Sequence, residues 1–183
     1  MWRKRSDFDQ VRERIINDAD KSRERTMNRA VKLLSAKPRS IGELRERLLE
    51  KVWTNEEIVN SVIEKLKEYK YLDDQQFARS LALSKLRQKP QGKRRLQQAL
   101  SRKQLDKEIV DEAIVSAFEK MPEGNLINLA IEKRLRLKGR PETREDKKKF
   151  YDHLLRQGFS YDLIRSRMAE ISKGELEQDL RNE

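Results

Sequence analysis

The residues of this chain with the most evident chemistry are basic and cluster between Asp74 and Asp106. This interval holds 31 residues, none of them acidic and nine of them basic. Lysine and arginine neutralise phosphates and release bound counterions, so such a cluster can follow a phosphate backbone with salt-sensitive affinity. A solvated helical face is the alternative, but such faces normally carry interleaved acids. We therefore predict a polyanion contact by Lys85, Arg87, Lys89, Lys93, Arg94, Arg95, Arg102 and Lys103.

A second basic run lies further along the chain. It contains Lys138 and Arg140 as well as the cations that we predict as a secondary basic patch, Lys133, Arg134, Arg136, Lys147, Lys148 and Lys149. Unlike the first cluster, it is interleaved with the acids Glu132, Glu142, Glu145 and Asp146. Two interpretations stay open, because this secondary patch can cover the same polyanion or simply solubilise a helix.

The sequence contains few of the residues and motifs that enzymes commonly use for catalysis. The one histidine, His153, stands between Asp152 and Leu154, and a lone histidine in such a helix is usually a surface or boundary residue. There is no cysteine, and we find no phosphate-binding loop, glycine-rich dinucleotide turn, zinc-ligand spacing or nucleophile elbow. We therefore expect a protein that is not an enzyme and that uses neither a cofactor nor a metal ion.

A heptapeptide marks the point where one helix ends and the next begins. We expect Asp73 to be an N-cap that accepts from N–H groups of the next turn, with Gln76 closing a capping box. Leu72 would pack on Phe77 as a hydrophobic staple. Two acids in a solvated loop, or a metal pair, explain neither the apolar neighbours nor the glutamine. The predicted structural junction comprises Tyr71, Leu72, Asp73, Asp74, Gln76 and Phe77.

The composition indicates an all-α fold with a basic surface. Lys and Arg number 43 against 32 Asp and Glu, a net charge of +11 that attracts polyanions. Leu, Ile, Val and Phe make up about a quarter of the residues, above the level of disordered chains. Six Gly and four Pro leave few turns for a sheet. With no apolar run near membrane-span length and no signal-peptide core, we expect a cytoplasmic protein without a membrane partner.

An internal repeat organises the expected helices. Met27–Leu48 aligns with Arg79–Leu100 at a shift of 52 residues with six identities, and a further shift of 54 reaches the last third of the chain. We predict tandem three-helix repeats, helix-turn-helix-like, that stack into an elongated, curved array because each is marginal alone. The predicted segments are 1–26, a charged extension with a short helical pattern at Phe8, Val11 and Ile15; repeats 27–73, 74–121 and 122–172; and a frayed tail, 173–183.

Apolar stripes at helical spacing predict the core of the repeats. In the first repeat the stripe comprises Ile58, Val59, Val62, Ile63, Leu66 and Tyr69. In the second it comprises Val110, Ala113, Ile114, Ala117 and Phe118. The third helix of each repeat opens with acids, which repel phosphate, so reading of a specific operator by these helices is disfavoured.

Several motifs resemble the RecX family of bacterial recombination regulators. They are Tyr71-Leu72-Asp73-Asp74 with Phe77, the basic helix that follows, and Arg156-Gln157-Gly158-Phe159 before Asp162 and Ile164. The resemblance covers residues 27–171. It implies tandem three-helix repeats and a protein that binds the RecA filament on DNA, lodges in its groove, hinders its growth and damps ATP hydrolysis, strand exchange and co-protease activity.

The resemblance also implies the partners. These are the RecA filament and single- or double-stranded DNA, bound without sequence specificity, in DNA repair and the SOS response; the ATP belongs to RecA. We expect a monomer. One alternative is a non-sequence-specific or helix-turn-helix-type DNA-binding protein without a RecA role. A further alternative is a helical scaffold whose basic face only keeps it in solution.

Overall fold

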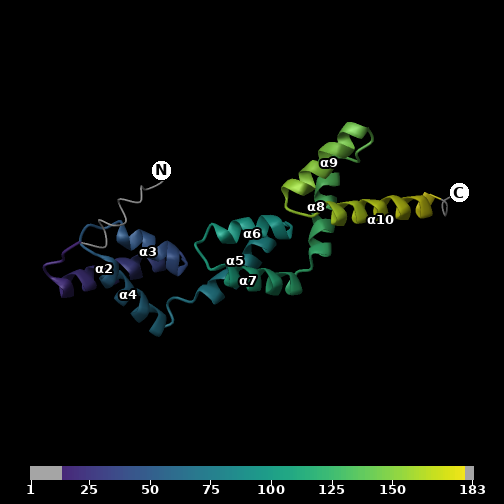
Figure 1. The fold of residues 1–183 in the computed structure, drawn as a ribbon. Coiled ribbons are helices and arrows are strands. Elements are labelled where there is room, and N and C mark those ends of the chain that lie inside the picture. Colours follow the sequence, from purple (N-terminus) through teal and green to yellow (C-terminus); the bar gives the residue numbers. More distant parts are fainter. Residues whose placement is uncertain (1–13, 180–183) are drawn as a thin grey trace. The chain divides into compact units, whose positions relative to one another are not determined.

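The computed structural model describes the backbone of residues 14–179 and the side chains as far as Glu170. Every regular element within residues 14–179 is an α-helix (Figure 1). The helices are α2 (Ala19–Ala36), α3 (Ile41–Leu49), α4 (Glu56–Glu68), α5 (Asp74–Gln88), α6 (Lys93–Ser101), α7 (Lys107–Lys120), α8 (Glu123–Lys138), α9 (Arg144–Arg156) and α10 (Tyr161–Asp179). The predicted all-α class is confirmed.

The chain folds into two compact units. The amino-terminal unit contains the described residues up to Ala78 together with Arg102–Ile109. The carboxy-terminal unit contains Arg79–Ser101 and the described residues from Val110 onward. Two of the three boundaries fall inside helices, because α5 and α7 each contribute residues to both units, and the third follows the end of α6 at Ser101.

The core of the amino-terminal unit lies among α2, α3 and α4, which pack pairwise (Figure 1). Its buried cluster comprises Ala30, Leu33, Leu44, Leu48, Leu49, Val59, Val62, Ile63, Leu66 and Leu72. The predicted stripe is buried from Ile58 to Leu66 and is confirmed there. Tyr69 is 65% exposed, so its prediction as a core residue was wrong. The reason is that α4 ends at Glu68 and the chain turns through Lys70, whose φ is 58°.

Asp73 caps the start of α5 at the junction with α4. Asp73 Oδ1 accepts from the backbone N–H of Gln76 at 2.8 Å, just before α5 begins, so its prediction as an N-cap is confirmed. Leu72 is 5% exposed within the core cluster. The side chain of Tyr71, which we predicted to be structural, is 69% exposed. That residue holds the junction through its backbone N–H, which donates to Leu66 O at 2.8 Å.

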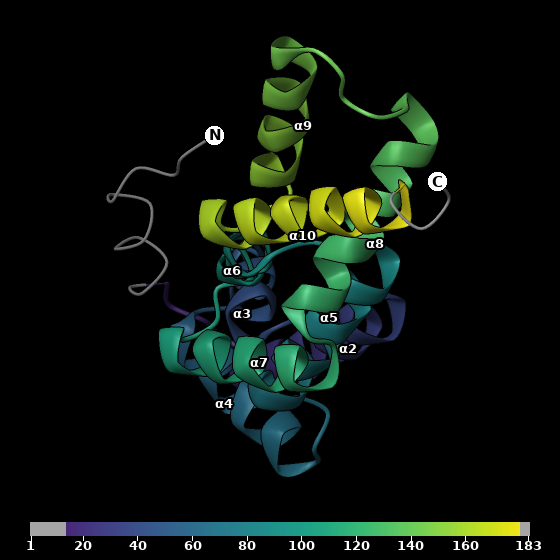
Figure 2. The same cartoon turned by 90° about the vertical axis from the view of Figure 1, so that its right-hand side faces the viewer.

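In the carboxy-terminal unit, α8, α9 and α10 pack on one another. Figure 2 shows that α10 runs crosswise to α9. The buried apolar residues of these three helices and the turn before α10 include Leu126, Ile127, Ile131, Phe150, Leu154, Phe159 and Ile164. On α7, the predicted stripe is buried from Val110 to Ala117 and is confirmed there, whereas its last residue, Phe118, is only half-buried. Leu96 and Leu100 of α6 are also fully buried, which matches their place in the sequence repeat.

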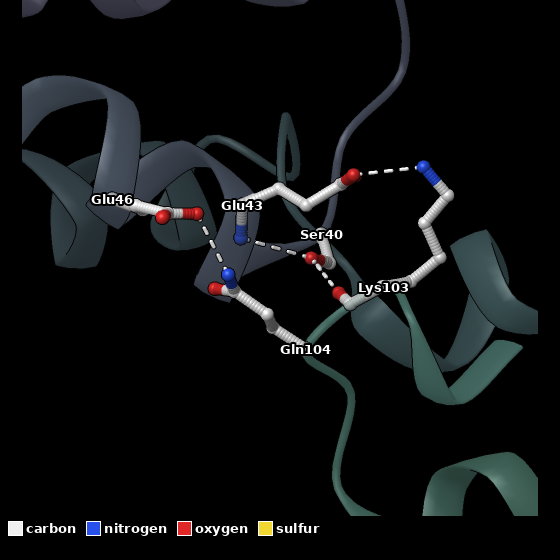
Figure 3. Close-up of polar contacts among 5 residues, drawn as sticks. All are labelled: Ser40, Glu43, Glu46, Lys103 and Gln104. Carbon is white, nitrogen blue, oxygen red and sulfur yellow. Dashed lines mark hydrogen bonds and ion pairs between the residues drawn. The ribbon is translucent and has the colours of Figure 1, made fainter. Parts of the chain in front are cut away.

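The start of α3 is fastened to the turn between α6 and α7 (Figure 3). Ser40 Oγ caps α3 by accepting from Glu43 N at 3.1 Å, and it donates to Lys103 O. The Lys103 ammonium lies 2.7 Å from a carboxylate oxygen of Glu43, and both side chains are about four-fifths buried. Gln104 donates to Glu46 at 2.7 Å. The first repeat of the sequence is thus tied to a turn that belongs to the second.

The start of α6 has the same relation to the turn between α9 and α10. The backbone N–H of Gly92 donates to Gln157 O at 3.0 Å, and that of Arg94 donates to Gly158 O at 3.3 Å. A Cβ on Gly92 would lie 2.3 Å from Gly158 O, so no other residue fits without moving backbone. Gly158 itself has a φ of 91°, which favours glycine.

A carboxylate completes each of these two arrangements. Asp74, the first residue of α5, accepts from Ile41 N at the start of α3 at 2.9 Å. Glu123, the first residue of α8, accepts from Lys93 N at the start of α6 at 2.8 Å. Each satisfies a backbone donor that the helix leaves unpaired. Burial raises the pKa of Asp74, and the hydrogen bond from Ile41 opposes this shift.

The ends of the described chain differ from the predicted segments. α2 begins at Ala19, capped by Asp18, which accepts from Lys21 N at 2.9 Å, so the helix starts inside the predicted extension. Phe8 and Val11 lie outside the described residues, and Ile15 is 91% exposed. α10 continues to Asp179, beyond the predicted end of the third repeat, and the last four residues of the tail lie outside the described part. None of the described helices is long and apolar enough to cross a membrane.

Candidate polyanion-binding site

The two predicted basic patches lie mostly in one compact unit. The carboxy-terminal unit holds Lys85, Arg87, Lys89, Lys93, Arg94, Arg95 and the whole secondary patch, Lys133, Arg134, Arg136, Lys147, Lys148 and Lys149. Arg102 and Lys103 belong to the amino-terminal unit. Most of these side chains are exposed, whereas Lys85, Arg95, Lys103 and Arg134 are half-buried.

A first recess, the Arg94 recess, opens between α6 and α9. It has a volume of about 380 Å³ and is lined by Arg94, Arg95, Gln98, Asp152, Leu155, Arg156 and Gly158. The guanidinium of Arg95 is engaged inside the unit, because it donates to Gln157 Oε1 at 3.0 Å and to Arg156 O at 3.3 Å. The exposed side chains of Arg94 and Arg156 are the cations best placed for an outside anion.

A second recess, the Leu137 recess, lies among three elements: helix α8, helix α9 and the turn that precedes α6. It measures about 130 Å³ and is lined by Lys89, Pro90, Ala130, Lys133, Arg134, Leu137, His153 and Gln157. The first basic cluster and the secondary patch therefore meet here, through Lys89 on one side and Lys133 and Arg134 on the other. The sequence left open whether the secondary patch joins the first, and the structure brings these members together.

The pKa of His153, which lines this recess, is lowered by the side chains around it. Burial lowers it below the ordinary value of 6.5, and the positive charges of Arg134, Arg156 and Lys89 lower it further. The cations that affect His153 come from both basic patches and from the Arg94 recess. The imidazole is therefore held neutral among cations at neutral pH.

A third recess, the Lys149 recess, lies between the end of α8 and α9. It measures about 380 Å³ and is lined by Arg134, Lys138, Gly139, Arg140, Pro141, Asp146, Lys149 and Phe150. Arg134 lines this recess as well as the Leu137 recess. The Lys149 ammonium lies 3.7 Å from a carboxylate oxygen of Glu145 and 4.0 Å from one of Asp146, and such long, exposed ion pairs contribute little to stability.

Six cations that line the three recesses make up a basic face. We use this name for Lys89, Arg94, Lys133, Arg134, Lys149 and Arg156. Arg156 was missing from the predicted contact residues, although it stands in the Arg156 to Phe159 motif that supports the resemblance. Its neighbours in space, Arg94 and Arg95, are about sixty residues earlier in the chain, so spacing alone does not reveal it.

Lys103 has a structural role that the sequence did not indicate. Its ammonium pairs with Glu43 at 2.7 Å, and its side chain is 22% exposed. The partner is 60 positions away, so a local pattern of charge does not predict the pair. Lys103 thus holds the turn before α7 against α3. Within residues 14–179, no three His, Cys, Asp or Glu side chains are grouped so as to hold a metal ion.

The fold and the basic face define a class of protein: tandem three-helix repeats that present a cationic surface. Family models match the chain in three consecutive places, as the first three-helix domain of RecX at residues 27–66, the second at 73–114 and the third at 125–167. The chain belongs to the RecX family.

Named relatives agree with this assignment. The chain is 32% identical over 153 residues to the regulatory protein RecX of Prosthecochloris aestuarii, covering 84% of this chain and 97% of the relative. It is 34% identical to the regulatory protein RecX of Chlorobium limicola, covering 84% and 93%. Against the regulatory protein RecX of Bacillus subtilis it is 32% identical over 79% of this chain but only 54% of that longer protein.

Solved structures share the fold. The crystal structure of RecX from Lactobacillus salivarius superposes with a TM-score of 0.74 at 23% identity, covering 84% of this chain and 98% of that chain. A second crystal structure, of a regulatory protein RecX, gives a TM-score of 0.68 at 23% identity over 80% of this chain. These likenesses establish the repeat fold, and the family names describe a regulator.

Proposed function

We propose that this protein binds the RecA recombinase filament on DNA and inhibits its growth, and with it the recombinase, ATPase and co-protease activities. Two findings support the proposal: the chain belongs to a family whose named members are regulatory proteins, and the carboxy-terminal unit carries the basic face. The basic face is the observation that carries it. The role would lie in DNA repair and the SOS response, in the cytoplasm.

The proposed contact surface is the basic face with the exposed cations beside it. A nucleoprotein filament presents phosphates and acidic side chains, and cations in open recesses neutralise them while releasing counterions. Arg95 and Lys103 contribute less to this contact surface, because their side chains already bind Gln157 and Glu43 within the protein. Lys85, Arg87, Lys93, Arg136, Lys147, Lys148 and Arg102 complete the proposed set.

The remaining parts of the proposal follow from the sequence. We keep the repeat boundaries at 27–73, 74–121 and 122–172, and the elongated, curved array stays a prediction. The protein acts as a monomer and without catalysis or a cofactor of its own, since the ATP that is hydrolysed belongs to RecA. DNA contacts are made to the backbone and carry no sequence preference.

The alternative is a DNA-binding protein without a RecA role. The net charge of +11 and the three-helix repeats favour it. Against it, the third helix of each repeat begins with acids, Glu56 and Glu57 in α4, Glu108 in α7 and Asp162 in α10. Carboxylates at the first turn repel phosphate and do not suit a helix that enters the major groove.

RecA ATP hydrolysis on single-stranded DNA tests the proposal. Added protein should reduce the hydrolysis rate in a dose-dependent way, and the effect should weaken as salt is raised, because backbone contacts release counterions. Unchanged hydrolysis at saturating protein, together with tight binding to one duplex sequence, would instead support the alternative. A protein without effect on RecA and without affinity for DNA would match the scaffold interpretation.

A further inference from the structure

The Leu137 recess has a more apolar lining than the two wider recesses. Pro90, Ala130 and Leu137 line it. Leu137 is 65% exposed although it is a large apolar residue near the end of a basic helix. A single exposed leucine is ordinary on a protein surface. Here, however, the leucine forms one wall of a concave site, where its exposure leaves apolar surface available to a partner.

The charged side chains that line the same recess are all cationic. Lys89, Lys133 and Arg134 line it, and no acidic residue does. The side-chain oxygen of Gln157 already accepts from Arg95 at 3.0 Å. His153 is held neutral by burial and by the surrounding cations, so its ring adds a wall without adding charge. The recess therefore combines apolar lining with positive charge and no acidic residue.

The size of the recess fits one side chain. Its volume is about 130 Å³, and an engineered cavity of about 150 Å³ lined by apolar side chains is known to hold one benzene molecule. A phenyl ring or a branched aliphatic group therefore fills it. No Phe, Tyr or Trp lines the recess, so it lacks the stacking platform that a nucleobase prefers.

We infer that the Leu137 recess binds an acidic segment of a protein partner, with one apolar side chain in the recess and flanking carboxylates on Lys89, Lys133 and Arg134. The inference rests on the proposed function, because it names the chemistry that the protein part of the nucleoprotein presents to the basic face. In this arrangement the wider Arg94 and Lys149 recesses bind phosphates of the DNA backbone. Charge complementarity selects the segment, and the apolar anchor gives specificity.

A peptide titration followed by NMR tests the inference. The probe is an acetylated pentapeptide with two acidic residues on each side of a phenylalanine, and the control peptide has alanine at the centre. The methyl signals of Leu137 and Ala130 should shift with saturation, and the phenylalanine peptide should bind at least about tenfold more tightly, because it buries more apolar area. The peptide's carboxylates beside Lys89, Lys133 and Arg134 should also raise the pKa of His153, which is measured from the NMR signals of its ring protons.

Two leucine variants on α8 localise the binding. Leu137→Lys should remove the difference between the two peptides. Leu129→Lys should keep it, since Leu129 is 50% exposed on the same helix but does not line the recess. Both side chains are exposed, so both variants should fold, which circular dichroism checks. Equal affinity for the two peptides in the unmodified protein would overturn the inference, as would displacement of the phenylalanine peptide from the Leu137 methyls by oligothymidylate.

RecA assays separate this inference from the proposed function. If the peptides fail to discriminate while the unmodified protein still inhibits RecA ATP hydrolysis, the inference falls and the proposed function stands. If the phenylalanine peptide binds as expected while RecA hydrolysis is unaffected by the protein, the inference is supported and the partner is another acidic protein.

Discussion

Replacing Gly92 by alanine should destabilise the carboxy-terminal unit strongly for a change of one methyl group. The new Cβ would lie 2.3 Å from Gly158 O, 2.4 Å from Gly158 C and 2.5 Å from Phe159 N, all of them backbone atoms that cannot rotate away. The start of α6 must therefore move from the turn before α10. The movement weakens two backbone hydrogen bonds, from Gly92 to Gln157 O and from Arg94 to Gly158 O.

The magnitude follows from these two effects. Two hydrogen bonds contribute about 1 kcal/mol each, and overpacking typically costs about 1–3 kcal/mol. We expect a loss of about 3 kcal/mol in the free energy of unfolding, or a fall in Tm of about 6–12 °C for a chain of this size. Chemical and thermal denaturation followed by circular dichroism measure both quantities.

Gly124→Ala is the matched control for this substitution. Its added Cβ meets only the end of the Arg167 side chain, at 2.8 Å, which can swing aside. Gly124 lies in α8, where alanine is preferred over glycine by about 1 kcal/mol. The control should therefore be neutral or slightly stabilising. A Gly92→Ala protein as stable as the unmodified one would refute the close packing of α6 against the turn before α10.

Three further changes test other parts of the structure. Leu72→Asp buries a carboxylate in the amino-terminal core and should lower the free energy of unfolding by about 4 kcal/mol; retention of full stability would show that Leu72 is not buried. Because the pKa of Asp74 is raised above 3.8, the folded state keeps its proton longer, so its contribution to stability is lost as pH rises through the raised pKa. Asp74→Asn should remove this loss in unfolding measured against pH, and an unchanged pH profile would contradict it. Because the pKa of His153 is lowered, the unfolded state takes up a proton first as pH falls below 6.5, which destabilises the protein; His153→Gln should flatten that decline in the same measurement, and a decline of equal size would count against the burial of His153.

Much of the fold follows from local patterns that the sequence displays. Isoleucine, valine and leucine at helical spacing predicted the core of α4, and the capping residue Asp73 predicted the start of α5. Both depend on residues within one or two turns. The core prediction for Tyr69 was wrong because the chain leaves the helix and turns through Lys70 with a positive φ, which a non-glycine residue seldom adopts. If the helical spacing of α4 is extended beyond the end of the helix at Glu68, it wrongly assigns the residues that follow to the buried face.

The candidate site was predicted less completely, for a physical reason. A charge run indicates which residues attract a polyanion, but not which of them the fold engages. Lys103 pairs with Glu43, and Arg95 donates to Gln157, both across about sixty residues of sequence. Arg156 joins the basic face for the same reason, since long-range packing sets its neighbours. The concave shape of the Leu137 recess likewise needs three separate segments and has no local signal.

RecA filament length on single-stranded DNA, measured by electron microscopy, tests the central claim most directly. Arg94 belongs to the basic face and Lys93 precedes it on α6, and both side chains are exposed. Lys93→Glu with Arg94→Glu therefore reverses charge and leaves the engaged Arg95 in place. Lys32→Glu with Lys37→Glu makes the same change at exposed positions in the amino-terminal unit. We expect the unmodified protein and the control to shorten filaments and the first variant to lose most of this effect. Filaments of full length with the unmodified protein, or equal shortening by both variants, would contradict the account.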